Sequence, residues 1–383
     1  MIDDLSIKRT KPLFSLADQL FNEESVARLS QGLKKSHRRF DAKGFEAEVL
    51  RQFPDLELKQ RIAAMVNALE QRLPDDFSKA VGVLQKALPE PLDPNLNDDD
   101  FGEFIWGVPA EYVARHGVTE DRLEISLPFL REATMRFTAE NAIRPFLKTY
   151  PEQTLAFVHE CAAHDNYHVR RLASEGIRPL LPWAPKVVLP AEMILEVLDR
   201  LHADTTRYVT RSVANNLNDL SKSDPELVLA RLHNWASARK QKGKELNWMT
   251  RHALRTLLKK GHAEALEFVG YPSAPEFWVS KVKVTESVTI GEKLRWQGVL
   301  TSRADQKLRI GLDIHFRKSD GSHSPKLFAV ADVAMARGER LDIDKSIAFK
   351  PLSTRTLYPG VHHVALKVNG IERARKSFNL IAG

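Results

Sequence analysis

YHVRRLASEGIRPLL, residues 167–181, decides the fold, because two later stretches repeat its pattern at a fixed distance. The copies are RYVTRSVANNLNDLS (207–221) and NWMTRHALRTLLKKG (247–261), so that the starting positions 167, 207 and 247 are evenly spaced. A weaker copy, RFTAENAIRPFL (136–147), comes before them and shares the tripeptide IRP. A period of about 40 residues in a helical region is typical of HEAT or armadillo-like helix pairs, which stack into a curved solenoid.

Helical periodicity extends from the start of the chain to about position 270. Leu58, Ile62, Met65 and Leu69 recur at three- and four-residue steps, which predicts a helix over 56–73. We therefore expect a mainly α-helical, HEAT-like domain over residues 1–270, with a loop at the proline-rich stretch 89–100. Its further helices are predicted near 77–88, 101–116, 122–133, 137–149 and 151–163, and onward to about residue 269.

The pattern changes at YPSAPEFW (271–278), where two prolines mark a boundary. Seven β-rich runs with period-two alternation follow, separated by turn signals such as KSDGS (318–322) and YPGV (358–361). Seven short strands in about 110 residues suit a small β-sandwich of immunoglobulin-like size. We expect this second domain to cover residues 271–383. The runs are WVSKVKV, SVTI, LRWQGVLT, LRIGLDIHFR, LFAVADVAM, LDIDKSIAF and HHVALKV.

Composition excludes several classes of protein. A chain of 383 residues has room for two domains, and no stretch approaches the roughly 18 apolar residues of a membrane helix. The single cysteine, Cys161, excludes an internal disulfide and a cysteine-rich zinc site. The first residues lack the apolar core of a secretion signal, so we expect a cytoplasmic protein without a membrane partner, a monomer by default.

Positive charge is concentrated in the later parts of the chain. The net charge of +7 divides into −6 for residues 1–134, +5 for 135–270 and +8 for 271–383. This distribution favours a polyanionic partner, although charge alone does not separate nucleic-acid binding from a merely basic soluble protein. In the last segment the basic clusters 317–326 and 372–376 suit a DNA-binding module, with a solubility or dimerisation domain as the alternative.

The repeat places Arg171, Arg211 and Arg251 in register. A row of arginines along one surface of a solenoid can follow a phosphate backbone. The alternative is that each arginine forms structural hydrogen bonds between adjacent repeats. The predicted DNA-binding set comprises Arg170, Arg171, Arg178, Arg207, Arg211, Arg251, Lys259 and Lys260.

Two carboxylates, Glu140 and Glu175, stand inside these basic repeats. Glu175 lies four positions after Arg171 and three before Arg178, which places the three on neighbouring helical positions. An intrahelical ion pair explains this spacing at least as well as a catalytic site does. Trp183 and Trp106 are each open to two interpretations, a functional aromatic or packing between repeats.

Motifs for metals, nucleotides and nucleophiles are weak in this sequence. His159 and His164 are five positions apart and do not share a helix face, whereas His164 and His168 have the spacing of four that two ligands need. No P-loop, dinucleotide fingerprint or GxSxG elbow is present. We expect neither a metal nor a cofactor.

RFTAENAIRPFL (136–147), RRLASEGIRPLLPWA (170–184) and RYVTRSVANNLNDL (207–220) resemble the helical-repeat alkylpurine DNA glycosylases, specifically the AlkC branch, which carries a C-terminal immunoglobulin-like domain. The resemblance covers essentially the whole chain. It implies a monofunctional glycosylase of base excision repair that hydrolyses the N-glycosidic bond of 3-methyladenine and 3-methylcytosine in duplex DNA, without metal, cofactor or base flipping. It also implies that Glu140, Glu175 and Trp183 line the lesion site, with Asp219 as a further candidate.

The chemistry of a cationic lesion fits these residues. The charged base leaves as a neutral molecule, while positive charge develops on the deoxyribose as in other glycoside cleavage. A fixed carboxylate stabilises that charge, a second one orients or deprotonates water, and an aromatic ring makes a cation–π contact. We expect Glu175 as principal electrostatic catalyst or water activator, Glu140 as its partner and Trp183 as the aromatic wall. The alternatives are a non-catalytic helical-repeat scaffold, a lesion-sensing DNA-binding protein and, more remotely, a metallo-hydrolase around His164 and His168.

Overall fold

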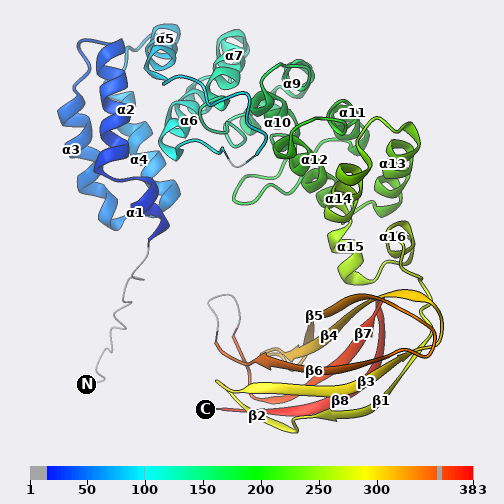
Figure 1. Cartoon of the computed structure of the whole chain (residues 1–383). Helices are drawn as coiled ribbons and strands as arrows, with labels where there is room; N and C mark the ends of the chain where they lie inside the picture. Colours follow the sequence, from blue (N-terminus) through cyan, green and yellow to red (C-terminus); the bar gives the residue numbers. More distant parts are fainter. Residues whose placement is uncertain (1–14, 99, 352–355, 383) are drawn as a thin grey trace, which may run out of the picture. The chain divides into compact units, whose positions relative to one another are not determined.

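The computed structural model describes residues 15–98, 100–351 and 356–382, in which helices come first and strands follow (Figure 1). The helices lie between Leu16 and Phe268 and the strands between Phe277 and Ile381. The chain forms two compact units: one holds residues up to 220 together with 235–249, and the other holds 221–234 together with the rest from 250. The predicted fold class, helices followed by a small β-sandwich, is confirmed.

The helices are short and carry side-chain caps at several of their first turns. Asn22 and Asp41, for example, accept hydrogen bonds from the backbone N–H groups of the third residues of their helices. The bounds of the longer helices are α2 Glu23–Ser36, α3 Ala42–Gln52, α4 Leu58–Glu70, α5 Phe77–Ala87, α6 Gly107–His116, α7 Leu123–Thr134, α9 Pro151–Ala162, α10 Tyr167–Glu175, α11 Ala191–Leu201, α12 Arg207–Leu220, α13 Pro225–Ala238 and α14 Gly243–Ala253. The shorter ones are α1 Leu16–Leu20, α8 Arg144–Thr149, α15 Arg255–Lys260 and α16 Ala263–Phe268.

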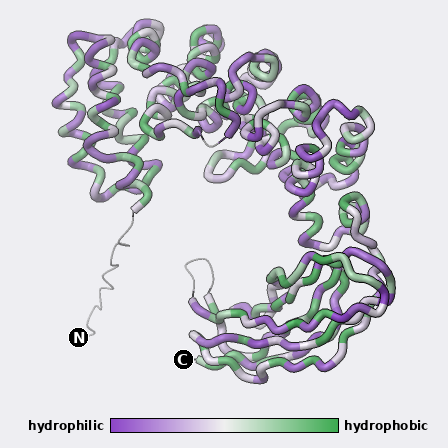
Figure 2. Tube along the Cα trace, in the orientation of Figure 1, coloured by the Kyte–Doolittle hydropathy of each residue, from purple (hydrophilic) through white to green (hydrophobic). Residues whose placement is uncertain are grey.

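Within the first unit the helices pack in two layers. Helices α5, α7, α9 and α11 contact one another in sequence, while α4 contacts α6 and α10 contacts α12. Helix α10 also packs against α9 and α11 of the other layer. Along these helices hydrophobic and hydrophilic residues alternate in the pattern of half-buried elements (Figure 2). The layer that contains α10 and α12 carries the polar residues of the candidate site.

One predicted helix is shorter than expected. The sequence pattern predicts a helix over 137–149, but α8 begins only at Arg144. Side-chain hydrogen bonds replace helical ones before it: the Thr134 hydroxyl accepts from the backbone N–H of Ala139, and the Thr138 hydroxyl accepts from that of Glu140. Such local bonds compete with the helix. Glu140 therefore lies in an irregular segment, outside any helix.

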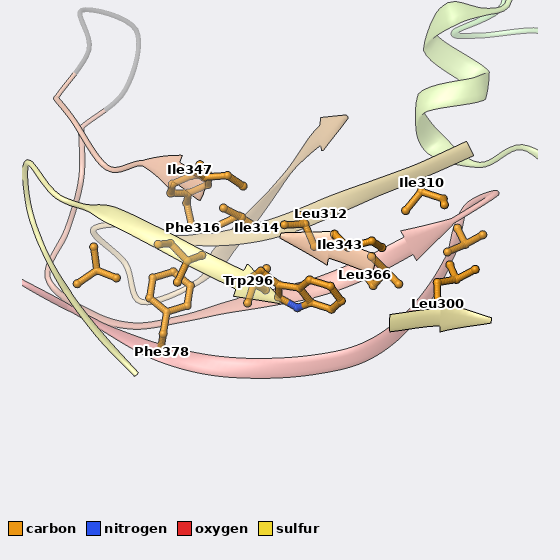
Figure 3. Close-up of a cluster of buried hydrophobic side chains, with 14 of the residues drawn as sticks. Trp296, Leu300, Ile310, Leu312, Ile314, Phe316, Ile343, Ile347, Leu366 and Phe378 are labelled. Carbon is orange, nitrogen blue, oxygen red and sulfur yellow. The ribbon is translucent and has the colours of Figure 1, made fainter. Parts of the chain in front are cut away.

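The strands form two sheets, one with the order β1-β3-β6 and one with the order β2-β8-β7-β4-β5. All neighbouring pairs are antiparallel except β2 and β8. The side chains between the sheets form one buried cluster, in which Trp296 and Leu300 of one sheet meet Leu312 and Leu366 of the other (Figure 3). The strands are β1 Phe277–Val284, β2 Ser287–Thr289, β3 Lys293–Ser302, β4 Gln306–Arg317, β5 His323–Met335, β6 Arg340–Ala348, β7 Gly360–Val368 and β8 Ile371–Ile381.

Seven of these strands coincide with the predicted runs, and β8 was missed. Its sequence, IERARKSFNLI, shows a basic cluster rather than a strand pattern. The alternation fails because a bulge interrupts its pairing with β7, and Ala374 within it has a positive φ of 52°.

The division of the chain into domains at residue 270 stays a prediction. The change from helix to strand falls between Phe268 and Phe277, near the predicted boundary, whereas the compact units divide earlier in the chain. None of the helices in the described ranges combines the length and the apolar character needed to cross a membrane.

A close backbone contact inside the second unit makes a prediction about Gly261. A Cβ atom at this position, where φ is +82°, would lie 2.2 Å from the Cα atom of Gly370. Gly338 has the same φ of +82° and no atom within 4 Å of a Cβ. Both Gly→Ala substitutions impose the left-handed backbone, but only Gly261→Ala adds a clash. We expect Gly261→Ala to lower the free energy of unfolding by about 1–3 kcal/mol more than Gly338→Ala in urea denaturation. Equal losses would contradict the close approach.

Candidate functional site

Arg171 of α10 joins the two carboxylates that the sequence singled out. Its Nη1 donates to Glu140 Oε2 and, over 2.7 Å, to the hydroxyl of Thr138, while its Nη2 lies 3.6 Å from Glu175 Oε1. Its guanidinium also lies 4.9 Å from the centre of the Tyr208 ring, within cation–π range. Glu140 and Glu175 come from neighbouring repeats, so this arginine fixes the spacing of two carboxylates that the chain supplies separately.

Glu175, at the last position of α10, is almost completely buried, with 4% of its surface exposed. Oε1 accepts from Arg178 Nη1 at 2.5 Å, and Oε2 accepts from the Ser212 hydroxyl of α12 at 2.6 Å. Arg178 in turn donates from Nε to Asp219 Oδ2 over 3.0 Å. The buried charges are thus paired and hydrogen-bonded, as burial requires.

These contacts decide the ionisation of Glu175. Burial by itself raises the pKa of this carboxyl, but the guanidinium groups of Arg171 and Arg178 and the Ser212 hydrogen bond outweigh it, so that the pKa lies below its usual range. Burial by itself lowers the pKa of the Arg171 guanidinium, but the charges of Glu140 and Glu175 outweigh it and raise that pKa. Glu175 is therefore a carboxylate at neutral pH, held in place by two cations.

Glu140 is the more accessible of the two carboxylates. Its side chain is 18% exposed, against 5% for Glu175. Both of its hydrogen bonds from described side chains, from Arg171 and from Thr138, end on Oε2. Oε1 is left as an anionic oxygen that accepts no hydrogen bond from the described residues, at the rim of the buried network.

Arg144, which sequence analysis did not select, holds the chain next to these carboxylates. It is fully buried and donates to the carbonyl oxygens of Gly176, Arg178 and Pro185 over 2.8, 3.0 and 2.8 Å. Burial, together with the nearby charge of Arg178, lowers its pKa. Arg144 thereby fixes both ends of the loop that carries Trp183.

Trp183 lies on the surface of that loop, with 75% of its area exposed. Its φ of +60° is unusual for a residue with a side chain, and Lys59 donates a hydrogen bond to its carbonyl oxygen. It borders a pocket of about 340 Å³ that is also lined by Lys59, Glu111 and Asn141. Burial raises the pKa of Glu111 there. The structure thus brings Glu140 and Glu175 together on Arg171 and places Trp183 on an exposed loop that Arg144 ties to the same network.

Trp106 and Asp219, the two undecided residues, are both buried. Trp106 donates from its indole to Glu103 over 3.3 Å and is 7% exposed, so it packs inside the helical unit. Asp219 is bonded to Arg178 and belongs to the carboxylate network.

Most arginines of the predicted DNA-binding set have internal partners. Arg170 binds both oxygens of Asp204 as well as two backbone carbonyl oxygens, and Arg178 is enclosed between Glu175 and Asp219. For Arg170 and Arg178 the structure favours the alternative interpretation, namely structural bonds within and between repeats. Their contact with phosphate stays untested.

Arg207 and Arg211 of α12 are about one third exposed. Arg207 binds Glu245 through two hydrogen bonds and lies 3.8 Å from the centre of the Trp248 ring. Arg211 pairs with Asp98 of the loop that precedes α6. That loop also meets the start of α12, because Asn97 accepts from the backbone N–H groups of Arg207 and Tyr208.

Three members of the set belong to the second unit. Arg251 donates to the Tyr271 hydroxyl and to the carbonyl oxygen of Val269, over 3.4 and 3.1 Å. Lys259 and Lys260, at the end of α15, are exposed. Their alignment with the arginines of the first unit stays a prediction.

The sequence contained a signal for one of the residues that we missed. Arg144 and Arg178 are the arginines of the two IRP tripeptides, and both are buried beside the carboxylates. A charged residue repeated within an otherwise apolar motif indicates a buried polar contact, which is an ion pair for Arg178 and a set of backbone hydrogen bonds for Arg144. Ser212 and Thr138, by contrast, act through hydroxyl groups whose partners only the folded chain brings together.

The chain combines two features: a helical unit with a buried carboxylate–guanidinium network comes first, and an immunoglobulin-like sandwich follows it in the sequence. Two family profiles match this chain. The DNA alkylation repair enzyme family matches residues 131–257, and the C-terminal Ig-like domain of the uncharacterised protein YhaZ matches residues 279–382. The chain therefore belongs to the DNA alkylation repair enzyme family, in the group with a YhaZ-like C-terminal domain.

Two relatives cover nearly the whole chain. The uncharacterised protein YhaZ of Bacillus subtilis is 32% identical over 357 residues, which cover 92% of this chain and 96% of YhaZ. The alkylpurine DNA glycosylase AlkC of Pseudomonas fluorescens, solved bound to DNA containing an abasic site analogue, is 32% identical. The two structures superpose with a TM-score of 0.85, and the match covers 96% of this chain and 100% of the AlkC chain. The predicted resemblance to the AlkC branch is confirmed.

His168, beside the network, makes a prediction about pH. It is buried against Tyr167 and Tyr208, and burial lowers its pKa to about 4. Since the unfolded chain binds this proton near the usual pKa of about 6.5, lowering the pH from there towards 4 stabilises the unfolded state. We expect the free energy of unfolding to fall over this range, and to fall less steeply in His168→Phe. An identical slope in the variant, measured by urea denaturation at several pH values, would exclude a neutral buried histidine.

Proposed function

We propose that this chain is a DNA glycosylase that excises cationic alkylated bases, 3-methyladenine and 3-methylcytosine among them, from duplex DNA in base excision repair. Membership of the DNA alkylation repair family and the similarity to AlkC support this proposal. The observation that carries it is a partly exposed carboxylate, Glu140, bound by Arg171, which also contacts the buried carboxylate of Glu175. The reaction is hydrolysis of the N-glycosidic bond, without strand cleavage.

The carboxylates supply the charge that the reaction needs. As the bond to a cationic base breaks, the base becomes neutral and the deoxyribose becomes positive. A carboxylate fixed beforehand stabilises that charge without reorganising, which is the largest contribution in many enzymes. Glu140 has an anionic oxygen that accepts no hydrogen bond from the described residues, so we assign it the contact with the sugar or the attacking water. Glu175, whose oxygens are both bonded, positions Arg171.

This assignment exchanges the roles expected from the sequence, where Glu175 was the principal catalyst. The exchange follows from burial, since water and a sugar reach a side chain that is 18% exposed more readily than one that is 5% exposed. Trp183, exposed on its loop, is proposed to stack on the lesion or its sugar through a cation–π contact. Its exposure supports capture of the lesion without base flipping, because an exposed ring can meet a base that stays in the duplex.

The first test compares three Glu→Gln variants on methylated duplex DNA. Under single-turnover conditions, with released bases resolved by chromatography, Glu140→Gln is expected to slow base release by about 10²–10³. Glu152→Gln, a matched change at an exposed position of α9, is expected to act at the wild-type rate. Glu175→Gln should lose both activity and stability, because it leaves Arg171 and Arg178 short of a counter-charge.

The outcomes separate the alternatives. Full-rate release by Glu140→Gln, with its fold intact by circular dichroism, would remove Glu140 from the reaction. DNA binding by the wild-type chain without any release of base would indicate a lesion-sensing protein instead of an enzyme.

A second test concerns Asp98, which forms an ion pair with Arg211. If Arg211 contacts phosphate, DNA must compete with this carboxylate. We expect Asp98→Asn to tighten binding of unmodified duplex by about two- to fivefold, the value of a partly exposed ion pair, and to steepen the salt dependence by about 0.9 in log–log slope.

Glu90→Gln is the matched control for this test. It removes one negative charge from the same loop, at an exposed position with no ion pair among the described residues. The prediction fails if Glu90→Gln tightens binding as much as Asp98→Asn, because the effect would then be one of net charge.

A further inference from the structure

The outer face of the five-stranded sheet contains a buried carboxylate. Ile314 and Phe316 of β4 point between the sheets (Figure 3), so alternation places Asp313 and His315 on the opposite face. A residue on an outer face is ordinarily exposed, yet Asp313 retains only 3% of its surface. Neighbouring parts of the chain therefore cover it.

Asp313 is short of hydrogen bonds. Among the described residues, its Oδ1 has no partner, and its Oδ2 has one long contact, 3.4 Å from Lys367 Nζ. A buried carboxylate normally accepts several hydrogen bonds, and an unsatisfied one points to a bound water or ion.

Two further ligand atoms converge on the same place. His315 Nε2 lies 3.1 Å from Glu372 Oε1 of β8, and these atoms and a carboxylate oxygen of Asp313 all lie within 4.8 Å of one another. Strand β7 separates β4 from β8, and the residue opposite Asp313 on it is Ala365. The small side chain of Ala365 leaves room for the longer ones to meet above it.

We propose that Asp313, His315 and Glu372 form a Zn²⁺ site that ties β4 to β8 across β7. One imidazole nitrogen and two carboxylate oxygens, completed by a water, make a four-coordinate set of the kind that zinc accepts. Zinc–ligand distances of about 2.0–2.2 Å require ligands about 3.3 Å apart, which the His315–Glu372 pair already meets. The imidazole favours zinc over magnesium or calcium, which prefer oxygen ligands alone.

Two cations near the site affect its strength. Lys367 Nζ lies 3.4 Å from Asp313 Oδ2, and Arg375 Nη1 lies 4.0 Å from Glu372 Oε2. Zinc must displace the ammonium of Lys367, whose 3.4 Å contact is weak, and it binds His315 in its neutral form. The proposal concerns the sandwich and does not depend on glycosylase activity.

The experiment uses the full-length chain, freed of metal with a chelator and titrated with Zn²⁺ in a calorimeter. We expect one equivalent to bind, and Asp313→Asn, His315→Gln and Glu372→Gln each to weaken it by about tenfold or more. Lys367→Met should bind more tightly, because it removes the competing cation. Saturating Zn²⁺ should raise the melting temperature of the wild type by about 2 °C or more.

Asp320→Asn is the control, since it removes a carboxylate from the turn between β4 and β5 without touching the cluster. It should bind Zn²⁺ like the wild type. Absence of stoichiometric binding by the wild type would overturn the proposal and leave a water as the partner of Asp313. Wild-type affinity in the three ligand variants would overturn it equally, by placing the metal elsewhere. Glu372 is partly exposed, so Glu372→Gln keeps the test valid if Asp313→Asn fails to fold.

Discussion

The candidate site depends on one constraint, which is that Arg171 bridges two carboxylates. One guanidinium holds Glu140, from an irregular segment, and Glu175, from the end of a helix, at a fixed separation. Two carboxylates that share one guanidinium would repel each other without it, which favours the protonation of one of them. The arginine, with Arg178 beside it, keeps Glu175 ionised in a place that excludes water. An enzyme that stabilises a developing positive charge needs that condition before its substrate arrives.

The same network connects the proposed reaction to the stability of the helical unit. Breaking a buried ion pair by removing one partner typically costs about 3–5 kcal/mol, because the other charge stays buried. Arg144 extends this dependence to the loop of Trp183, since its three hydrogen bonds fix the backbone on both sides of that residue. Trp183 can keep its strained backbone conformation because the hydrogen bonds of Arg144 hold the chain on both sides of it. A large exposed aromatic ring held in this way is typical of a binding surface rather than of packing.

The sequence predicted the fold well because both domains have strong periodicity. The helical repeat and the change at residue 271 indicated the fold class, and seven of the eight strands in the described ranges were found. Strand β8 was missed because a bulge interrupts its alternation. The predicted start of the helix that contains α8 was too early, because side-chain hydrogen bonds to the backbone replace helical ones before Arg144. The pairing of Glu175 with Arg171 and Arg178 followed from helical spacing, but the contact of Arg171 with Glu140 depends on tertiary structure. The internal partners of Arg170 and Arg211, Asp204 and Asp98, lie far away in the sequence, so no local pattern reveals them.

The claim that ionised carboxylates drive the reaction is tested most directly by the pH dependence of base release. Under single-turnover conditions, DNA containing 3-methyladenine should lose its base at a rate that stays constant from about pH 8 to about pH 5.5, because the pKa of Glu175 lies below its usual value. A rate that falls with an apparent pKa near 7 would show that a carboxyl on which the reaction depends is protonated at neutral pH. That result would contradict the account.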